Sequence, residues 1–92
     1  SSDVCSSDLR AEVKERLKIG SLTLGEVLLA VDGDEGDGEV LAKLKVVSVL
    51  ESLPGVGKVG ARRLMRDLDI AENRRLRGLG ANQRRALLER FG

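Results

Sequence analysis

The amino-acid sequence predicts an all-α fold, a small helical domain of about five helices, from three observations. Apolar residues recur at helical spacing, as in Val46, Val49, Leu50 and Leu53, which places them on one helix face. No stretch shows the alternation of apolar and polar residues that is typical of a half-buried strand. Glycines, one proline and capping residues divide the chain into segments of helical length. A length of 92 residues predicts one small domain or a domain with a tail.

The first nine residues, SSDVCSSDL, differ from the rest because the triplet SSD occurs twice. We expect residues 1–9 to be an atypical tail, artefactual or disordered, and residues 10–92 to form the domain. A single cysteine excludes an intrachain disulfide, and the lack of histidine excludes a histidine-based catalytic or zinc site. We therefore expect no cofactor and no metal. The lone cysteine fits a reducing compartment, and no membrane span or signal peptide is visible, so we expect a cytoplasmic protein.

The first helix is expected over Leu9–Ile19, because Leu9, Val13 and Leu17 recur every four residues. Gly20 is expected to end it.

The start of the second helix has a strong sequence signature. Thr23 and Glu26 have the spacing of a capping box, and Leu22 and Val27 can form the hydrophobic staple around it. This helix is expected to continue through Val31.

Residues 32–39, DGDEGDGE, hold five acids and three glycines. The segment resembles a calcium loop, but the EF-hand register fails, because Gly36 stands at position 5 and Lys43 at position 12 counted from Asp32. We therefore expect a flexible, solvated loop.

A third helix is expected over Val40–Leu53, and Pro54 stops it because the residue before a proline is driven out of the α region. A fourth is expected from about Lys58 to Leu68, with arginines on an outward stripe. Its inward side chains are expected to be those of Val59, Leu64 and Leu68.

The C-terminal part is expected to hold an irregular connection over Asp69–Gly80, with one helical turn at Glu72–Leu76. Asn82 is a good N-cap, so the last helix is expected to start there. The residues expected to close the core are Leu87, Leu88 and Phe91.

The segment Leu53–Lys58, LPGVGK, is called the hairpin. Gly55 and Gly57 can adopt positive φ, and the following helix directs its free amide groups and positive dipole end toward them. With Lys58 this predicts an anion site, for which phosphate is the usual occupant. An ordinary turn between two helices stays open as the alternative.

Charge is distributed unevenly along the chain. Residues 1–51 hold six Lys/Arg and eleven Asp/Glu, net −5, whereas residues 52–92 hold ten and four, net +6. This asymmetry predicts a polyanionic partner for the second half, although a merely solvated basic face is the alternative. With one aromatic residue, Phe91, the chain has no platform for stacking single-stranded bases.

The segment Asn73–Gly80, NRRLRGLG, is called the arginine segment. Its three arginines offer planar forks for phosphate or base edges, and a narrow A·T-rich minor groove attracts arginine. Cations also cluster near two helix starts, where they oppose the dipole unless an external anion covers the same amides. The residues expected to contact nucleic acid are Gly55, Val56, Gly57, Lys58, Arg62, Arg74, Arg75, Arg77, Gly78, Gly80, Arg84 and Arg85.

The stretch from the hairpin to the arginine segment resembles the core of the actinobacterial integration host factors, as do RAEVKERLK before it and NQRRALLERFG after it. These are nucleoid-associated proteins with an S13-like helix-two-turns-helix domain. The resemblance covers about Arg10–Gly92 and implies a non-enzymatic protein that binds double-stranded DNA, bends or compacts it, and assists site-specific recombination. It also implies that the hairpin grips the backbone and that Arg74, Arg75 and Arg77 engage the minor-groove side.

The chain departs from that family at its start, where SSDVCSSDL replaces the beginning of a long charged helix. The resemblance implies a nucleoid location and a recombinase as a protein partner, and we expect a monomer in solution. An S13-like binder of structured RNA is the first alternative. An accessory module of a repair nuclease or glycosylase is the second, although no catalytic constellation is present. A purely structural interaction protein is the third.

Overall fold

A computed structural model describes residues 2–33 and 38–91, and within these residues the chain forms six α-helices and one short 3-10 helix. The elements are α1 (Ser2–Ile19), α2 (Leu24–Gly33), α3 (Gly38–Lys43), α4 (Val46–Ser52), α5 (Gly57–Asp67), η1 (Leu76–Gly78) and α6 (Ala81–Phe91). The predicted all-α fold is therefore confirmed. No helix in the described part of the chain has the length and apolarity needed to cross a bilayer.

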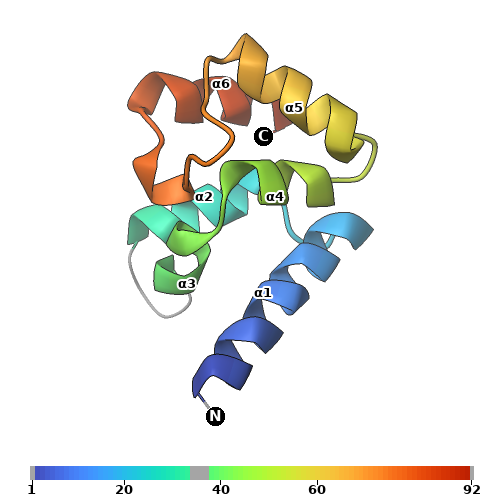
Figure 1. The fold of residues 1–92 in the computed structure, drawn as a ribbon, viewed down its shortest axis with the longest axis vertical. Coiled ribbons are helices and arrows are strands. Elements are labelled where there is room, and N and C mark those ends of the chain that lie inside the picture. Colours follow the sequence, from blue (N-terminus) through green and yellow to red (C-terminus); the bar gives the residue numbers. More distant parts are fainter. Residues whose placement is uncertain (1, 34–37, 92) are drawn as a thin grey trace.

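Helix α4 lies at the centre of the fold (Figure 1). It packs against α1 on one side and α5 on the other, while α2 packs against α3 and α6. Burial of a large apolar side chain stabilises a fold by about 1.5–3 kcal/mol, so these contacts supply most of the stabilisation. The large side chains that are fully buried are Leu17, Leu24, Leu28, Leu50, Met65, Leu76 and Leu87.

The sequence predicted that the first helix starts at Leu9, but α1 begins at Ser2. The division into a tail and a domain stays a prediction. The end of α1 is as expected: Gly20 has φ +82°, and the Ser21 N–H donates to the Arg16 carbonyl at 2.9 Å, which closes the last turn.

The capping box of α2 is confirmed. The Glu26 N–H donates to the Thr23 hydroxyl and the Thr23 N–H donates to the Glu26 carboxylate, both at 3.2 Å. Helix α2 continues through Gly33 and α3 starts at Gly38, so both ends of the predicted loop at 32–39 are helical. Residues 34–37 lie outside the described residues, and the loop prediction is not tested there.

The prediction of a single helix over Val40–Leu53 is wrong, because α3 and α4 are separate helices. Lys45 between them is extended, with φ −73° and ψ 142°. The backbone there pairs with the arginine segment: the Val46 N–H donates to the Arg74 carbonyl at 2.9 Å, and the Leu76 N–H donates to the Leu44 carbonyl at 3.0 Å. These long-range hydrogen bonds replace helical ones, and local periodicity does not reveal them.

Helix α5 presents Ala61 and Met65 to the core, with 0% and 1% of their surface exposed. The prediction that Val59 points inward is wrong, because its exposed fraction is 74%. Val59 precedes Ala61 by two residues, which is about 200° around a helix, so the two side chains face opposite ways. Leu64 and Leu68 are half-buried, as an inward-leaning face requires.

Two details of the C-terminal part differ from the prediction. The helical turn is η1 at Leu76–Gly78 and not at Glu72–Leu76. Gly80, and not Asn82, is the N-cap of α6, because the Arg84 N–H donates to the Gly80 carbonyl at 2.9 Å. The core is closed by Leu87 (0% exposed), but Leu88 is 36% exposed.

Candidate nucleic-acid interface

The hairpin joins α4 to α5 through two left-handed glycines. Leu53 is extended, as the following proline requires, and Gly55 and Gly57 have φ of +83° and +69°. A Cβ built on either glycine would meet nothing within 4 Å, so positive φ and not crowding explains the glycines. The backbone of the hairpin is therefore open to solvent at the start of α5, where free amide groups gather. Lys58 is exposed and Val56 is half-buried at the N-cap.

The outward face of α5 is strongly basic. Arg62, Arg63 and Arg66 are all exposed, which confirms the predicted stripe. The last turn carries Asp67, which accepts a hydrogen bond from Arg90 of α6 at 2.8 Å. Within residues 2–33 and 38–91, no ion pair includes Lys58 or the three α5 arginines.

The arginine segment is fixed to the core at two points. Leu76 and Leu79 are buried, with 2% and 9% exposure. The bridge between Lys45 and Arg75 joins the backbone of the segment to the residue that precedes α4. The segment is thus irregular backbone whose leucines are buried in the core. Arg74, Arg75 and Arg77 are exposed.

The predicted glycines of the arginine segment have separate roles. A Cβ on Gly78 would lie 3.1 Å from Cδ of Arg74, so the arginine side chain lies across this glycine. The Gly80 N–H donates to the Gln83 side chain at 3.1 Å, and the amide of Gln83 donates to the Asp69 carbonyl at 3.2 Å. Gln83 therefore ties the start of α6 to the end of α5.

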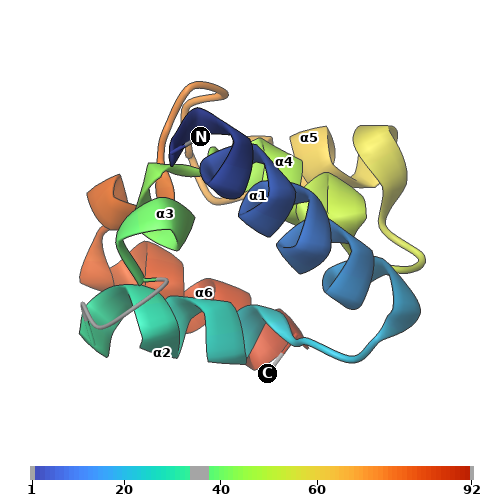
Figure 2. The same ribbon diagram turned by 90° about the horizontal axis from the view of Figure 1, so that it is seen from below.

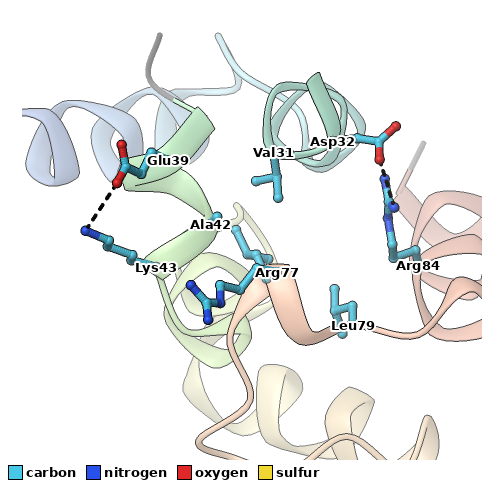
Figure 3. A pocket seen from close by; sticks show the side chains of 9 residues that line it. Val31, Asp32, Glu39, Ala42, Lys43, Arg77, Leu79 and Arg84 are labelled. Carbon is cyan, nitrogen blue, oxygen red and sulfur yellow. Dashed lines mark hydrogen bonds and ion pairs between the residues drawn. The ribbon is translucent and has the colours of Figure 1, made fainter. Parts of the chain in front are cut away.

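Helix α6 carries the last two predicted residues. Arg85 is exposed, whereas Arg84 is half-buried and its guanidinium donates to Asp32 of α2 at 3.5 Å. Figure 3 shows this ion pair at one side of a hollow, with the pair Glu39–Lys43 at the other side and Arg77 between them. Arg84 thus has an intramolecular partner, although this ion pair is weak because the Asp32 side chain is 67% exposed.

The hairpin and the arginine segment lie at opposite ends of α4. The bridge to Arg75 precedes the first residue of α4, and the hairpin follows its last residue. Because α4 has seven residues, the two sites are separated by about 10 Å along its axis. This separation is on the scale of the grooves of B-DNA, which are roughly 6 and 12 Å wide.

One cation next to the arginine segment was missed. Lys45 is exposed and lines a shallow hollow together with Arg74, Arg75 and Arg77. Lys45 lies in the extended backbone between α3 and α4, and no local sequence pattern distinguished it from the other residues of the helix predicted over Val40–Leu53. In the described ranges, no cluster of three or more His, Cys, Asp or Glu could hold a metal ion.

Comparison with known proteins places these features in one family. Residues 17–91 match the model of the S13-like H2TH domain. The chain is 55% identical over 83 residues to a Mycobacterium tuberculosis protein named Integration host factor, covering 90% of this chain and 75% of that protein. It is 53% identical over 83 residues to the Streptomyces coelicolor protein of the same name, covering 90% and 74%.

A solved structure is also similar over nearly the whole chain. It is described as sIHF bound to an 8 bp palindromic DNA, and the two folds agree with a TM-score of 0.87 at 48% identity. The similarity covers 99% of this chain and 98% of that one.

Proposed function

The chain belongs to the integration host factor family with an S13-like H2TH domain, and on this premise we propose that it is an architectural protein of double-stranded DNA. It clamps the phosphate backbone, bends or compacts the duplex, and assists site-specific recombination. The DNA-bound state of the similar solved structure supports this proposal. The names of the relatives favour this function over an S13-like role on structured RNA.

The observation that carries the proposal is the open hairpin. Gly55 and Gly57 expose their backbone at the start of an 11-residue helix, and a Cβ built on either would meet nothing within 4 Å beyond the adjoining backbone. A phosphate can therefore approach the amides closely, with Lys58 beside them as a compact cation. An ordinary turn would explain the glycines but not the lysine and the exposed arginines of α5 that follow.

The arginine segment has a different role in this proposal. Arg74, Arg75 and Arg77 are exposed on a backbone that is held to the core. Their flat guanidinium groups therefore enter the minor groove from fixed positions relative to one another. Arginine in a narrow groove responds to groove width, and phosphate contacts do not distinguish sequences. The proposed site thus combines uniform backbone contact with a preference for DNA shape.

The remaining predicted residues extend this surface. Arg62 and Arg85 add exposed charge on α5 and α6, and Arg84 contributes once it leaves Asp32. We propose that the protein acts without catalysis, as a monomer of the nucleoid, with a site-specific recombinase as its protein partner.

A titration of the full chain against duplex DNA, duplex RNA and single-stranded DNA tests this function. We expect the tightest binding on duplex DNA, with log K falling by about 0.9 per neutralised phosphate for each unit of log[salt]. A slope shallower than about −2, or equal affinity for duplex RNA, would contradict the proposal. A role as a purely structural interaction protein predicts no salt-dependent binding at all.

A further inference from the structure

The last two turns of α1 lie beside the hairpin, although the two segments are far apart in sequence (Figures 1 and 2). Val13 and Leu17 of α1 are buried against the core and fix the helix there. Between α1 and the hairpin runs a groove, called the α1 groove. Its charged residues are Lys14, Glu15, Lys18, Glu51 and Lys58.

The cations of the α1 groove face outward. Lys14, Lys18 and Lys58 are exposed, as is Glu15, whereas Glu51 is half-buried. No ion pair within the described ranges joins any of these lysines to a carboxylate, whereas Arg16 on another face of α1 binds Glu12 at 2.6 Å. Arg16, which does not line the groove, is therefore paired, whereas Lys14 and Lys18, one turn apart on α1, line the groove without an ion pair in the described ranges.

The groove continues the surface assigned to phosphate. Gly55 and Gly57 line it together with Lys14 and Lys18, so the open backbone of the hairpin forms one wall and α1 forms the other. Each strand of a duplex carries a phosphate per about 3.4 Å of axis, so a backbone resting on the hairpin brings further phosphates along the groove.

We propose that Lys14 and Lys18 bind phosphates of the same DNA backbone that the hairpin receives. The ligand is the phosphodiester chain of double-stranded DNA, and α1 becomes the second wall of the clamp. This inference rests on the proposed function, and it adds two cations from the acidic half of the chain to the interface.

Charge-matched variants of the full chain test the inference by titration with one duplex at several salt concentrations. Lys18→Ala and Lys14→Ala should each weaken binding about tenfold at low salt and make the slope of log K against log[salt] shallower by about 0.9. Arg16→Ala removes the same charge from the same helix, but outside the groove, and should leave the slope unchanged. Glu51→Gln should strengthen binding. Far-UV circular dichroism checks that each variant keeps its helix content.

The outcomes separate this inference from the proposed function. If Lys58→Ala loses a phosphate contact while Lys14→Ala and Lys18→Ala behave like Arg16→Ala, the inference is overturned and the DNA-binding function stands. If the unchanged protein shows no salt-dependent binding to the duplex, both are overturned.

Discussion

The hairpin and the arginine segment carry the same kind of charge but are built in opposite ways. The hairpin is a local structure: two left-handed glycines and a proline shape it, and its glycine positions border open space. The arginine segment depends on distant residues, since its leucines are buried and its backbone bonds to Leu44 and Val46. The hairpin is therefore characterised by open space around its backbone, and the arginine segment by its contacts with the core.

This difference separates two ways of presenting cations to DNA. An open backbone with a lysine allows close approach to phosphate at any sequence. A backbone tied to the core keeps several arginines in one register, and a fixed register is needed before groove width can be distinguished. Substitutions that act on one construction and spare the other test whether the contrast is real.

The largest expected effect is loss of the core anchor of the arginine segment. Leu76→Ala should lower the free energy of unfolding by about 2–5 kcal/mol, because it empties a site that is 2% exposed. Val56→Ala in the hairpin is the comparison, and it should cost clearly less because Val56 is half-buried. Chemical denaturation measures the free energy of unfolding of both variants. Equal decreases would show that the hairpin depends on the core as much as the arginine segment does.

A β-branched residue in the hairpin should have the next largest effect. Gly55→Val places a stiff side chain at φ +83°, and the left-handed conformation costs about 1–2 kcal/mol for such a residue. The added atoms also obstruct a phosphate at the backbone. The affinity for duplex DNA should therefore fall by more than the fraction of unfolded variant accounts for. Gly55→Asn tolerates this φ and should preserve the fold. If Gly55→Val keeps full affinity, the hairpin is only a turn.

A smaller, stabilising effect is expected at the start of the connection to the arginine segment. Asp69 has φ +58° at the end of α5, where the Ile70 N–H donates to the Met65 carbonyl at 2.7 Å. Asp69→Gly relieves the left-handed conformation and should raise stability by about 0.5 kcal/mol after the entropy of glycine is subtracted. Asp69→Asn removes the charge and keeps the backbone preference, so it separates the two contributions. A decrease in stability with glycine would contradict this interpretation.

The contrast also explains how much the sequence could predict. The capping box at Thr23, the end of α4 before Pro54 and the left-handed glycines are local chemistry, and all were correctly expected. The break at Lys45 depends on hydrogen bonds to residues about thirty positions later, which no local pattern contains.

The same limit applies to the candidate site. Exposure of Lys58 and of the arginines of α5 follows from helical spacing and charge, and the structure agrees. The pairing of Arg84 with Asp32 and the position of Lys14 beside the hairpin depend on tertiary packing between distant elements. The residue types thus indicated a phosphate ligand, and only the fold shows which cations are exposed and without an ion pair in the described residues.

The proposed division of roles is that the hairpin binds phosphate uniformly while the arginine segment responds to groove shape. Its most direct test is the affinity of Lys58→Ala, Arg75→Ala and Arg77→Ala for two duplexes of equal length, one A·T-rich and one G·C-rich. Lys58→Ala should weaken both about equally and make the salt slope shallower by roughly 1. The arginine variants should lose more on the A·T-rich duplex, whose narrow groove has the more negative potential, and should bend it less. An equal loss from all three variants on both duplexes, with bending unchanged, would contradict the account and make the arginine segment one more backbone clamp.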